Sequence, residues 1–331
     1  MRYELQWSNA HVRTVRQLTS KVRQIEIVPL SGAMAYSAGS HINVRVMVDG
    51  QPEPRSYSLV GQVAIDGAYR IAVQLQRNGR GGSQYMWRLA AGNSISISNP
   101  QNLFEFSFGR PHYLLLAGGI GITPLVGMAQ CLMAIGASFQ MLYCGRSFCE
   151  MAYLNELDQL LGSCLQLAIK DEGTRVDLHK VFQSLPADTE VYFCGPIHML
   201  EAARSIWRDQ NRPSERFRFE TFGSSGQFPR ESFNVHVHDL GRSVAVTENM
   251  TMLDALENAG IPIMSDCRRG ECGLCLVDVV ALEGQIDHRD VFLSDDQKQQ
   301  GSKICTCVSR AVNGSITIDS GFRSSAAGIS R

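Results

Sequence analysis

The stretch Cys267-Arg268-Arg269-Gly270-Glu271-Cys272-Gly273-Leu274-Cys275 places three cysteines in one short loop. Thiolates are soft ligands that bind iron and zinc well. The chain opens with Met1-Arg2-Tyr3-Glu4 and without an apolar signal segment, so we expect it in the reducing cytoplasm. In that compartment, cysteines this close together indicate a metal or iron–sulfur site rather than disulfides. Gly270 and Gly273 allow tight turns and leave backbone amides free to face the sulfurs.

The spacing of these cysteines indicates which metal centre they bind. The pattern C-x4-C-x2-C resembles that of plant-type ferredoxins, which hold a [2Fe-2S] cluster, whereas zinc ribbons carry two C-x2-C pairs. Cys305 and Cys307 both lie in range for the fourth ligand and, on one expected strand, would face the same side. Spacing favours Cys305, but Thr306-Cys307-Val308 resembles the segment around the last ferredoxin ligand. We therefore expect the ligands Cys267, Cys272, Cys275 and Cys307.

Length and charge limit the class of protein. A chain of 331 residues is expected to form two or three domains. Its 31 basic and 32 acidic residues nearly cancel, so we expect neither nucleic acid nor an anionic membrane as a partner. Residues 113–145 contain no Asp, Glu, Lys or Arg. Glycines and Pro124 interrupt that stretch, so we expect a strand, a tight loop and a buried helix rather than a membrane span.

The pattern of apolar residues changes twice along the chain. Short strands separated by Gly and Pro predict an antiparallel β-barrel, with strands at 22–28, 41–48, 69–75 and 94–98. Alternating strands and helices then predict a parallel α/β sheet, with strands at 113–117, 139–144, 165–169 and 190–194 and helices at 125–135, 153–161 and 197–210. After a small-residue segment, 223–229, a hairpin of 233–238 and 243–246 is followed by a helix capped by Thr251. We expect domains 1–108, 109–225 and 226–331, with a linker at about 223–232.

A glycine-rich loop opens the expected α/β domain. Ala117-Gly118-Gly119-Ile120-Gly121-Ile122-Thr123-Pro124 follows a strand and begins a helix. Glycines let a dinucleotide pyrophosphate approach the backbone, and the helix start supplies free N–H groups. A tight packing turn explains the same glycines. Cys144-Gly145-Arg146 and Cys194-Gly195-Pro196 end two further strands, where ligands of open α/β sheets bind; ordinary strand–helix turns remain the alternative.

Two motifs in the first domain suit an anionic cofactor. Arg55-Ser56-Tyr57-Ser58 offers a cation, an aromatic wall and two hydroxyls on a strand. Gly79-Arg80-Gly81-Gly82-Ser83 precedes an expected helix and forms a second anion-receptive turn.

In this order, the motifs make the whole chain resemble the phthalate dioxygenase reductase family, which includes the vanillate demethylase reductases. The resemblance implies an FMN-binding β-barrel, an NADH-binding α/β domain and a C-terminal β-grasp ferredoxin domain. It implies that the flavin is held by Arg55, Tyr57 and Ser58, with Gly81, Gly82 and Ser83 at its phosphate. It implies that the nucleotide is held by Gly119, Gly121, Thr123 and Pro124, with Cys194, Gly195 and Pro196 near the nicotinamide. Phe222 of Glu220-Thr221-Phe222 would lie beside the flavin. We interpret Asp287-His288-Arg289-Asp290, another family-like segment, as a charged surface loop.

The electron count then predicts the reaction. A hydride carries two electrons and a cluster accepts one, so we expect the order NADH, FMN, cluster, with no catalytic acid–base side chain. The resemblance implies a Rieske-type oxygenase as acceptor and thus an oxygenase or demethylase reductase component, which we expect to be a monomer. A reductase for a quinone, ferric chelate or monooxygenase, a non-enzymatic ferredoxin-like carrier, and FAD in place of FMN remain alternatives. No basic cluster joins Arg146, so we favour NADH over NADPH.

Overall fold

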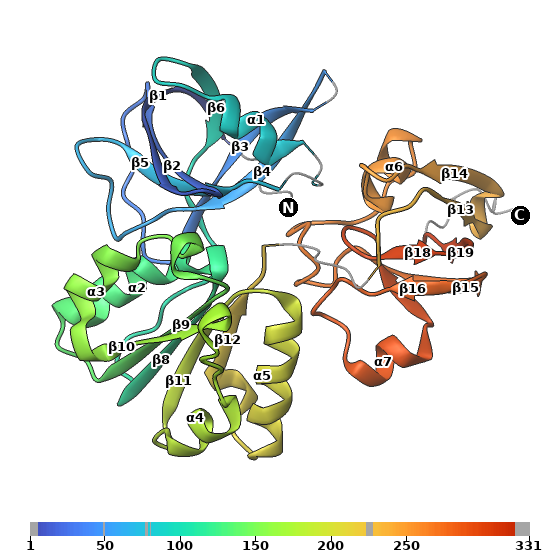
Figure 1. Ribbon diagram of the computed structural model, residues 1–331. Helices are drawn as coiled ribbons and strands as arrows, with labels where there is room; N and C mark the ends of the chain where they lie inside the picture. Colours follow the sequence, from blue (N-terminus) through green and yellow to red (C-terminus); the bar gives the residue numbers. More distant parts are fainter. Residues whose placement is uncertain (1–5, 49, 77–78, 80, 223–227, 322–331) are drawn as a thin grey trace, which may run out of the picture. The chain divides into compact units, whose positions relative to one another are not determined.

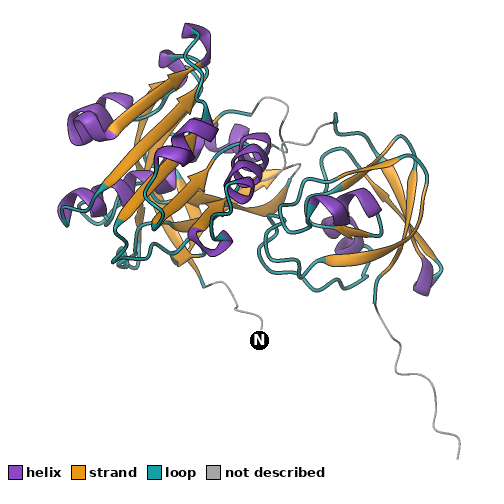
Figure 2. Cartoon of the chain, turned by 90° about the horizontal axis from the view of Figure 1, so that it is seen from below, coloured by secondary structure: helices purple, strands orange, loops and turns teal. Residues whose placement is uncertain are grey.

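The computed structural model describes residues 6–48, 50–76, 79, 81–222 and 228–321 (Figure 1). The chain divides into two compact units, Met1–Glu220 and Thr221–Arg331. The first combines an antiparallel sheet with a parallel sheet flanked by helices, and the second is built on a mixed sheet (Figure 2). This arrangement confirms the expected multidomain α+β fold class. Arg80 and half of the expected linker, residues 223–227, lie outside the described residues.

The antiparallel sheet closes into a barrel. Its strand order is β4-β3-β6-β1-β2-β5, and a bridge between Leu59 and Ile71 joins its two ends. Alternate side chains of β3 point inward, so Val44 and Val46 are buried while Arg45 between them is exposed. A short helix, α1, packs on β3 and β5. The bounds are β1 Trp7–Thr19, β2 Val22–Pro29, β3 Ser40–Val48, β4 Gln51–Ser58, β5 Tyr69–Gln74, β6 Ser94–Ser98, β7 Gln101–Asn102 and α1 Gly82–Arg88.

The parallel sheet has the order β10-β9-β8-β11-β12, so the chain runs outward from β8 and then returns to its other side. The topological switch point, where such sheets bind ligands, therefore lies between β8 and β11. Helices α2 and α3 cover one face, and α4 and α5 cover the other (Figure 1). The bounds are β8 His112–Gly118, β9 Phe139–Gly145, β10 Leu165–Ile169, β11 Thr189–Cys194, β12 Phe217–Glu220, α2 Ile122–Ala134, α3 Leu154–Leu161, α4 Leu178–Ser184 and α5 Ile197–Asp209.

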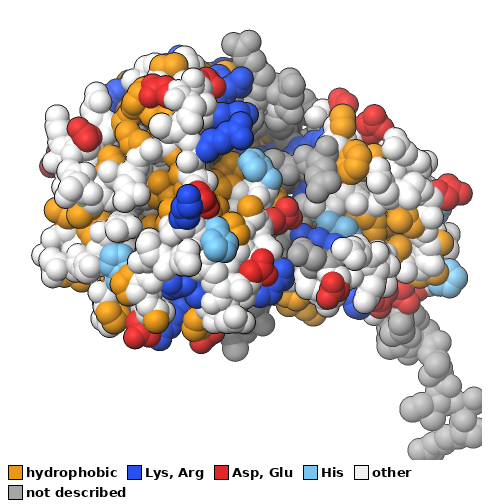
Figure 3. Space-filling model, turned by 60° about the horizontal axis from the view of Figure 1, so that its bottom comes forward, with side chains coloured by type: hydrophobic (Ala, Val, Ile, Leu, Met, Phe, Trp, Pro, Cys, Tyr) orange, Lys and Arg blue, Asp and Glu red, His pale blue; other side chains and the backbone are white. Residues whose placement is uncertain are grey.

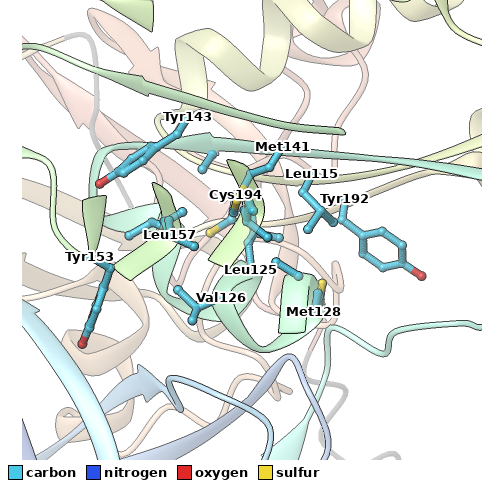
Figure 4. Packing of buried hydrophobic residues seen from close by; sticks show 14 of the residues in the cluster. Leu115, Leu125, Val126, Met128, Met141, Tyr143, Tyr153, Leu157, Tyr192 and Cys194 are labelled. Carbon is cyan, nitrogen blue, oxygen red and sulfur yellow. The ribbon is translucent and has the colours of Figure 1, made fainter. Parts of the chain in front are cut away.

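One hydrophobic core joins the barrel to the α/β sheet. Leu115, Met141 and Tyr143 of the sheet and Leu125 of α2 belong to one hydrophobic cluster (Figure 4), which also includes barrel residues such as Val60. The backbone of α2 also comes close to the barrel, since a Cβ at Gly127 would lie 2.4 Å from the Gly61 oxygen. The first unit is therefore continuously packed across the two sheets.

The second unit has the β-grasp arrangement. Its sheet order is β14-β13-β19-β15-β17, with β13 parallel to β19, and β16 pairs with β18. The predicted hairpin is confirmed, as is the Thr251 cap, whose hydroxyl accepts a hydrogen bond from the Asp254 amide. The bounds are β13 Phe233–Val237, β14 Arg242–Val246, β15 Leu276–Leu282, β16 Gln285–Asp287, β17 Lys303–Cys305, β18 Arg310–Val312, β19 Ser315–Asp319, α6 Met252–Asn258 and α7 Asp295–Gln300.

The charge-free stretch 113–145 forms β8, α2 and β9, as predicted. Within the described ranges, no helix has the length and apolar character needed to cross a membrane. On the face drawn in Figure 3, acidic and basic side chains are interspersed.

Candidate functional site

Arg55 and Gly82 lie against each other at the barrel. Arg55 is on β4, and Gly82 begins α1. A Cβ at Gly82 would lie 2.9 Å from both Cγ and Nε of Arg55, so a larger residue there would force this side chain to move. The Arg55 side chain is 17% exposed, and its guanidinium pairs with Glu53 at 2.5 Å. A partly buried cation beside the amides of a helix start suits a phosphate group. The donor set therefore fits a flavin phosphate.

The neighbouring polar groups of this motif are already engaged or buried. Ser56 Oγ donates to Asn43 Oδ1 at 2.7 Å, and Ser83 Oγ accepts from the Gln76 amide at 3.0 Å. Burial raises the pKa of Tyr57 far above that of an exposed phenol, so its hydroxyl stays protonated. Gly81 has φ +74°, the left-handed backbone that lets the chain turn into α1.

Ser58 links the barrel to the parallel sheet. Its hydroxyl donates to Glu220 Oε2 at 3.4 Å, and both residues are buried. Glu220 ends β12 and is paired in register with Cys194 of β11. Two motifs that are 162 positions apart in the sequence therefore meet at the carboxyl edge of the sheet.

The loops that follow β8 and β11 touch at the switch point. A Cβ at Gly121 would lie 2.1 Å from the Cys194 carbonyl oxygen, and one at Gly118 would lie 2.6 Å from Pro196 Cδ. Packing between the two loops therefore requires glycine at both positions, so a tight packing turn explains these two glycines. Gly119 differs, because it has φ +57° and open space where its Cβ would be. A pyrophosphate is therefore able to approach the backbone at Gly119.

The other nucleotide-loop residues support this geometry from within. Thr123 is buried, and its hydroxyl donates to the Ile120 carbonyl at 3.0 Å. Pro124 lies in the first turn of α2, as predicted. The Cys194 side chain lies inside the hydrophobic core rather than at the edge of the sheet (Figure 4). At Cys194, only the backbone is therefore available to a ligand.

Arg146 follows β9 on an exposed edge. Its side chain is 70% exposed, and its Nε lies 3.9 Å from Asp171 Oδ1 at the end of β10. Glu172 is the next residue. Acidic side chains here oppose a 2′-phosphate, so the local charge favours a nucleotide that lacks one.

The cysteine loop spans the region between α6 and β15. Gly270 and Gly273 have φ +78° and +74°, and a Cβ at Gly273 would lie 2.3 Å from the Phe292 ring. The Arg269 amide donates to Cys267 Sγ at 3.4 Å, as expected for amides that face sulfur. Four or five thiols beside such amides fit a [2Fe-2S] cluster.

Cys275 contacts both candidates for the fourth ligand. Hydrogen bonds from Cys305 and then Cys307 lower the pKa of the Cys275 thiol to about 3. Cys305 ends β17, and Cys307 lies beyond it in a turn, so the expectation that one strand carries both was wrong. Contact with Cys275 and burial raise the pKa of Cys307, which also interacts with Cys267 and with the Gly270 amide. Cys307 therefore faces the loop.

Zinc and a two-iron cluster differ in the number of thiolates that each metal ion takes. Across the part of the chain that the structure describes, no three His, Cys, Asp or Glu side chains have the arrangement that holds one metal ion. Structural zinc needs four ligands around one ion, whereas each iron of a two-iron cluster takes two thiolates.

Glu271 of the cysteine loop holds the start of the second unit. Its Oε1 accepts from the amide and the hydroxyl of Thr221, at 2.9 and 3.0 Å. Its Oε2 lies 3.3 Å from Arg269 Nη2. Phe222 directly follows Thr221 and is 43% exposed, so it is not a core residue. Sequence reasoning missed Glu271, because nothing in its spacing separates it from a solvated side chain.

The segment 287–290 is buried, so its interpretation as a charged surface loop was wrong. Asp287 and Arg289 are each 2% exposed and pair at 2.6 Å, while Asp290 is fully buried. Four consecutive titratable residues predict a solvated loop unless their partners are known, and here the partners come from distant segments, such as Ser309.

Three protein-family models match the chain in the expected order. They are the oxidoreductase FAD-binding domain at residues 12–106, the oxidoreductase NAD-binding domain at 115–205 and the 2Fe-2S iron-sulfur cluster binding domain at 235–312. The first name leaves FMN and FAD unresolved, since it describes a domain rather than this protein's cofactor.

Relatives and solved structures cover nearly the whole chain. The heme-dependent oxidative N-demethylase beta subunit of Ectopseudomonas mendocina (strain ymp) is 33% identical over 94% of this chain and 98% of its own length. The structure of phthalate dioxygenase reductase, described as modular for electron transfer from pyridine nucleotides to [2Fe-2S], is 29% identical with a TM-score of 0.77 over 95% of this chain and 98% of that one. An intact type IV self-sufficient cytochrome P450 monooxygenase is 33% identical with a TM-score of 0.66 over 94% of this chain, which spans only 41% of that protein.

Proposed function

We propose, from the premise that this chain belongs to the phthalate dioxygenase reductase family, that it is the reductase component of a two-component Rieske-type oxygenase or demethylase. As a member of the family, it is an NADH-dependent oxidoreductase that works with a flavin and a [2Fe-2S] cluster. The observation that carries the proposal is the chain of contacts Ser58–Glu220–Cys194–Gly121. It connects the flavin motif to the nucleotide loop within one packed unit.

In this proposal, the residues bind and orient cofactors and transfer no proton. When bound, the flavin accepts a hydride from NADH and the cluster takes electrons one at a time. Arg55 and the amides after Gly81 would hold the flavin phosphate, with Ser56, Tyr57, Ser58 and Ser83 supporting the pocket. Gly119, Thr123 and Pro124 would present the start of α2 to the pyrophosphate. Gly118 and Gly121 hold this loop against Gly195 and Pro196.

For the cluster we propose Cys267, Cys272, Cys275 and Cys307 as ligands. Both cysteines interact with Cys275, but Cys307 also interacts with Cys267 and with the Gly270 amide, which supports Cys307 over Cys305. Cys307→Ser is expected to abolish the visible and electron paramagnetic resonance spectra of the cluster, and the matched control Cys305→Ser is expected to keep them. The reverse result would make Cys305 the ligand.

The family resemblance also supports a proposal for which flavin and which nicotinamide nucleotide this chain binds. We propose FMN, which mass spectrometry of the released flavin tests; the mass of FAD would contradict it. NADH is proposed over NADPH, and a monomer in the cytoplasm completes the proposal. The domain limits proposed for these roles are 1–108, 109–225 and 226–331.

The proposed electron acceptor is tested by reconstituting turnover with an oxygenase. Purified holoprotein is mixed with NADH, O2, a Rieske oxygenase and the substrate of that oxygenase, and product is measured per NADH consumed. Turnover close to one product per NADH supports the proposal, whereas rapid NADH oxidation without product contradicts it. A heme oxygenase is the second candidate, because one relative is named for heme and another similar chain belongs to a cytochrome P450. A heme partner that restores coupled turnover would select this alternative.

A further inference from the structure

The buried carboxylate Asp290 lies directly behind the cysteine loop. A Cβ at Gly270 would lie 2.9 Å from the Asp290 Cα, and the Val291 amide donates to the Gly270 carbonyl at 3.0 Å. The backbone on either side of the carboxylate therefore packs against the loop that we assign to the cluster. The contact also explains why residue 270 is glycine, since a side chain there would meet backbone atoms.

Asp290 is held in its ionised form. Burial alone would raise its pKa, but His288, the Leu293 amide, the charge of Lys298 and the Ser309 hydroxyl together outweigh it, so the pKa is lowered. The Leu293 amide lies 2.9 Å from Oδ2, and Ser309 Oγ lies 3.0 Å from Oδ1. His288 Nδ1 lies 3.5 Å from the same oxygen. A fully buried carboxylate with these donors carries its charge at neutral pH.

Two arginines of this region pair with groups other than Asp290, whereas the charge of Lys298 acts on Asp290 and offsets part of its charge. The Arg289 guanidinium pairs with Asp287 at 2.6 Å and donates to the Phe228 carbonyl. Arg310 donates to backbone carbonyl oxygens, including those of Met250 and Thr247. The charge of Asp290 is therefore not cancelled by either arginine of the segment.

Ser309 joins the Asp290 carboxylate to the segment that carries the last cysteines. Its amide donates to the Cys305 carbonyl at 3.0 Å, while its hydroxyl donates to Asp290. The carboxylate thus lies between the cysteine loop and the segment that carries Cys305 and Cys307.

We propose that Asp290 sets the reduction potential of the cluster, lowering it by opposing the added negative charge. This inference rests on the proposed function, because it assumes that the loop holds a [2Fe-2S] cluster. One electron reduces the cluster and raises its negative charge by one unit, with no bond made or broken. A buried charge is screened little by solvent, so its effect on that step is larger than that of a surface charge. Asp290 is a positioning residue, since it acts through the loop and not on substrate.

The test is a potentiometric titration of the full holoprotein at about pH 8, where an ordinary histidine is neutral. Asp290→Asn is expected to favour the reduced cluster about tenfold, which is about 59 mV for a one-electron couple. Asp296→Asn, which removes an exposed negative charge on α7, is the matched control and is expected to leave the potential unchanged.

A second variant keeps the test decisive if Asp290→Asn does not fold. Ser309→Ala keeps the carboxylate but removes a hydrogen bond that disperses its charge. It is expected to lower the potential, opposite to Asp290→Asn, whereas a merely looser loop would shift both variants in the same direction. Equal potentials in wild type and Asp290→Asn, or shifts of the same sign in both variants, would overturn the inference. If Asp290→Asn does not bind the cluster, an unshifted or raised potential in Ser309→Ala would overturn it. A wild-type protein without a cluster spectrum would instead refute the proposed function.

Discussion

Gly121→Ala tests whether contact between the β8 and β11 loops positions the nucleotide. The backbone at Gly121 has φ −61°, which alanine adopts freely, so only space forbids the substitution. The added Cβ would lie 2.1 Å from the Cys194 carbonyl oxygen, and ordinary contact begins at 3.4 Å. The two loops must therefore separate by about 1.3 Å, and misplacement by roughly 1 Å costs about 100-fold in rate when reacting groups must be aligned.

The assay is anaerobic stopped-flow reduction of the flavin by NADH. We expect kcat/KM for NADH to fall about 100-fold while flavin content and the cluster spectrum remain at wild-type levels. Overpacking should also cost about 1–3 kcal/mol of unfolding free energy. Gly136→Ala is the control, because this residue lies just beyond the other end of α2, has φ +63° and meets nothing within 4 Å. Wild-type NADH kinetics in Gly121→Ala, or an equal loss in Gly136→Ala, would refute the reasoning.

Three further predictions concern the barrel, the sheet and the nucleotide edge. Gly82→Ala should displace Arg55 and lower flavin content after dialysis, whereas Gly92→Ala, which meets no atom within 4 Å, should retain flavin. Glu190→Gln should lower the free energy of unfolding by about 3 kcal/mol, because Arg110, Arg218 and Ser107 all donate to this fully buried carboxylate. Calorimetry measures this loss, and the control is Asp188→Asn, which removes the exposed carboxylate that pairs with Arg216. Burial raises the pKa of Glu190, but these hydrogen bonds lower it below its usual value, so its stabilisation is present above about pH 4.5 and is lost as pH falls through the lowered pKa; a difference from Glu190→Gln that persists in strong acid would contradict this. Asp171→Asn should increase kcat/KM for NADPH several-fold with little change for NADH, and an unchanged ratio would show that Asp171 does not oppose the 2′-phosphate.

The central strands of the α/β sheet were predictable because they are largely buried, whereas the partly exposed β12 was not predicted. Every residue of β8 is buried, so an apolar run marks it in the sequence, and β10 has the predicted limits of 165–169. β1 was not predicted. Its pairing with β2 shifts register twice, between Val12 and Thr14 and between Gln17 and Thr19, and each shift interrupts the alternation of apolar and polar residues.

The motifs of the site could be predicted from the sequence, but the contacts between them could not. Ser58 and Glu220 each belonged to a recognisable segment, yet only the fold brings them within hydrogen-bond distance. Gly121 and Gly119 look equivalent in the loop sequence, and the structure gives them different surroundings. The burial of Asp290 depends on Ser309 and on the Leu293 amide, which no local pattern specifies.

The most direct test of the electron path is an anaerobic titration of the holoprotein with NADH, followed by absorbance. A flavin that accepts two electrons and a cluster that accepts one predict full reduction by about 1.5 equivalents of NADH. In the rapid phase, flavin absorbance should fall before that of the cluster. Purified protein without flavin, or a cluster reduced by NADH while the flavin remains oxidised throughout, would contradict the proposed path.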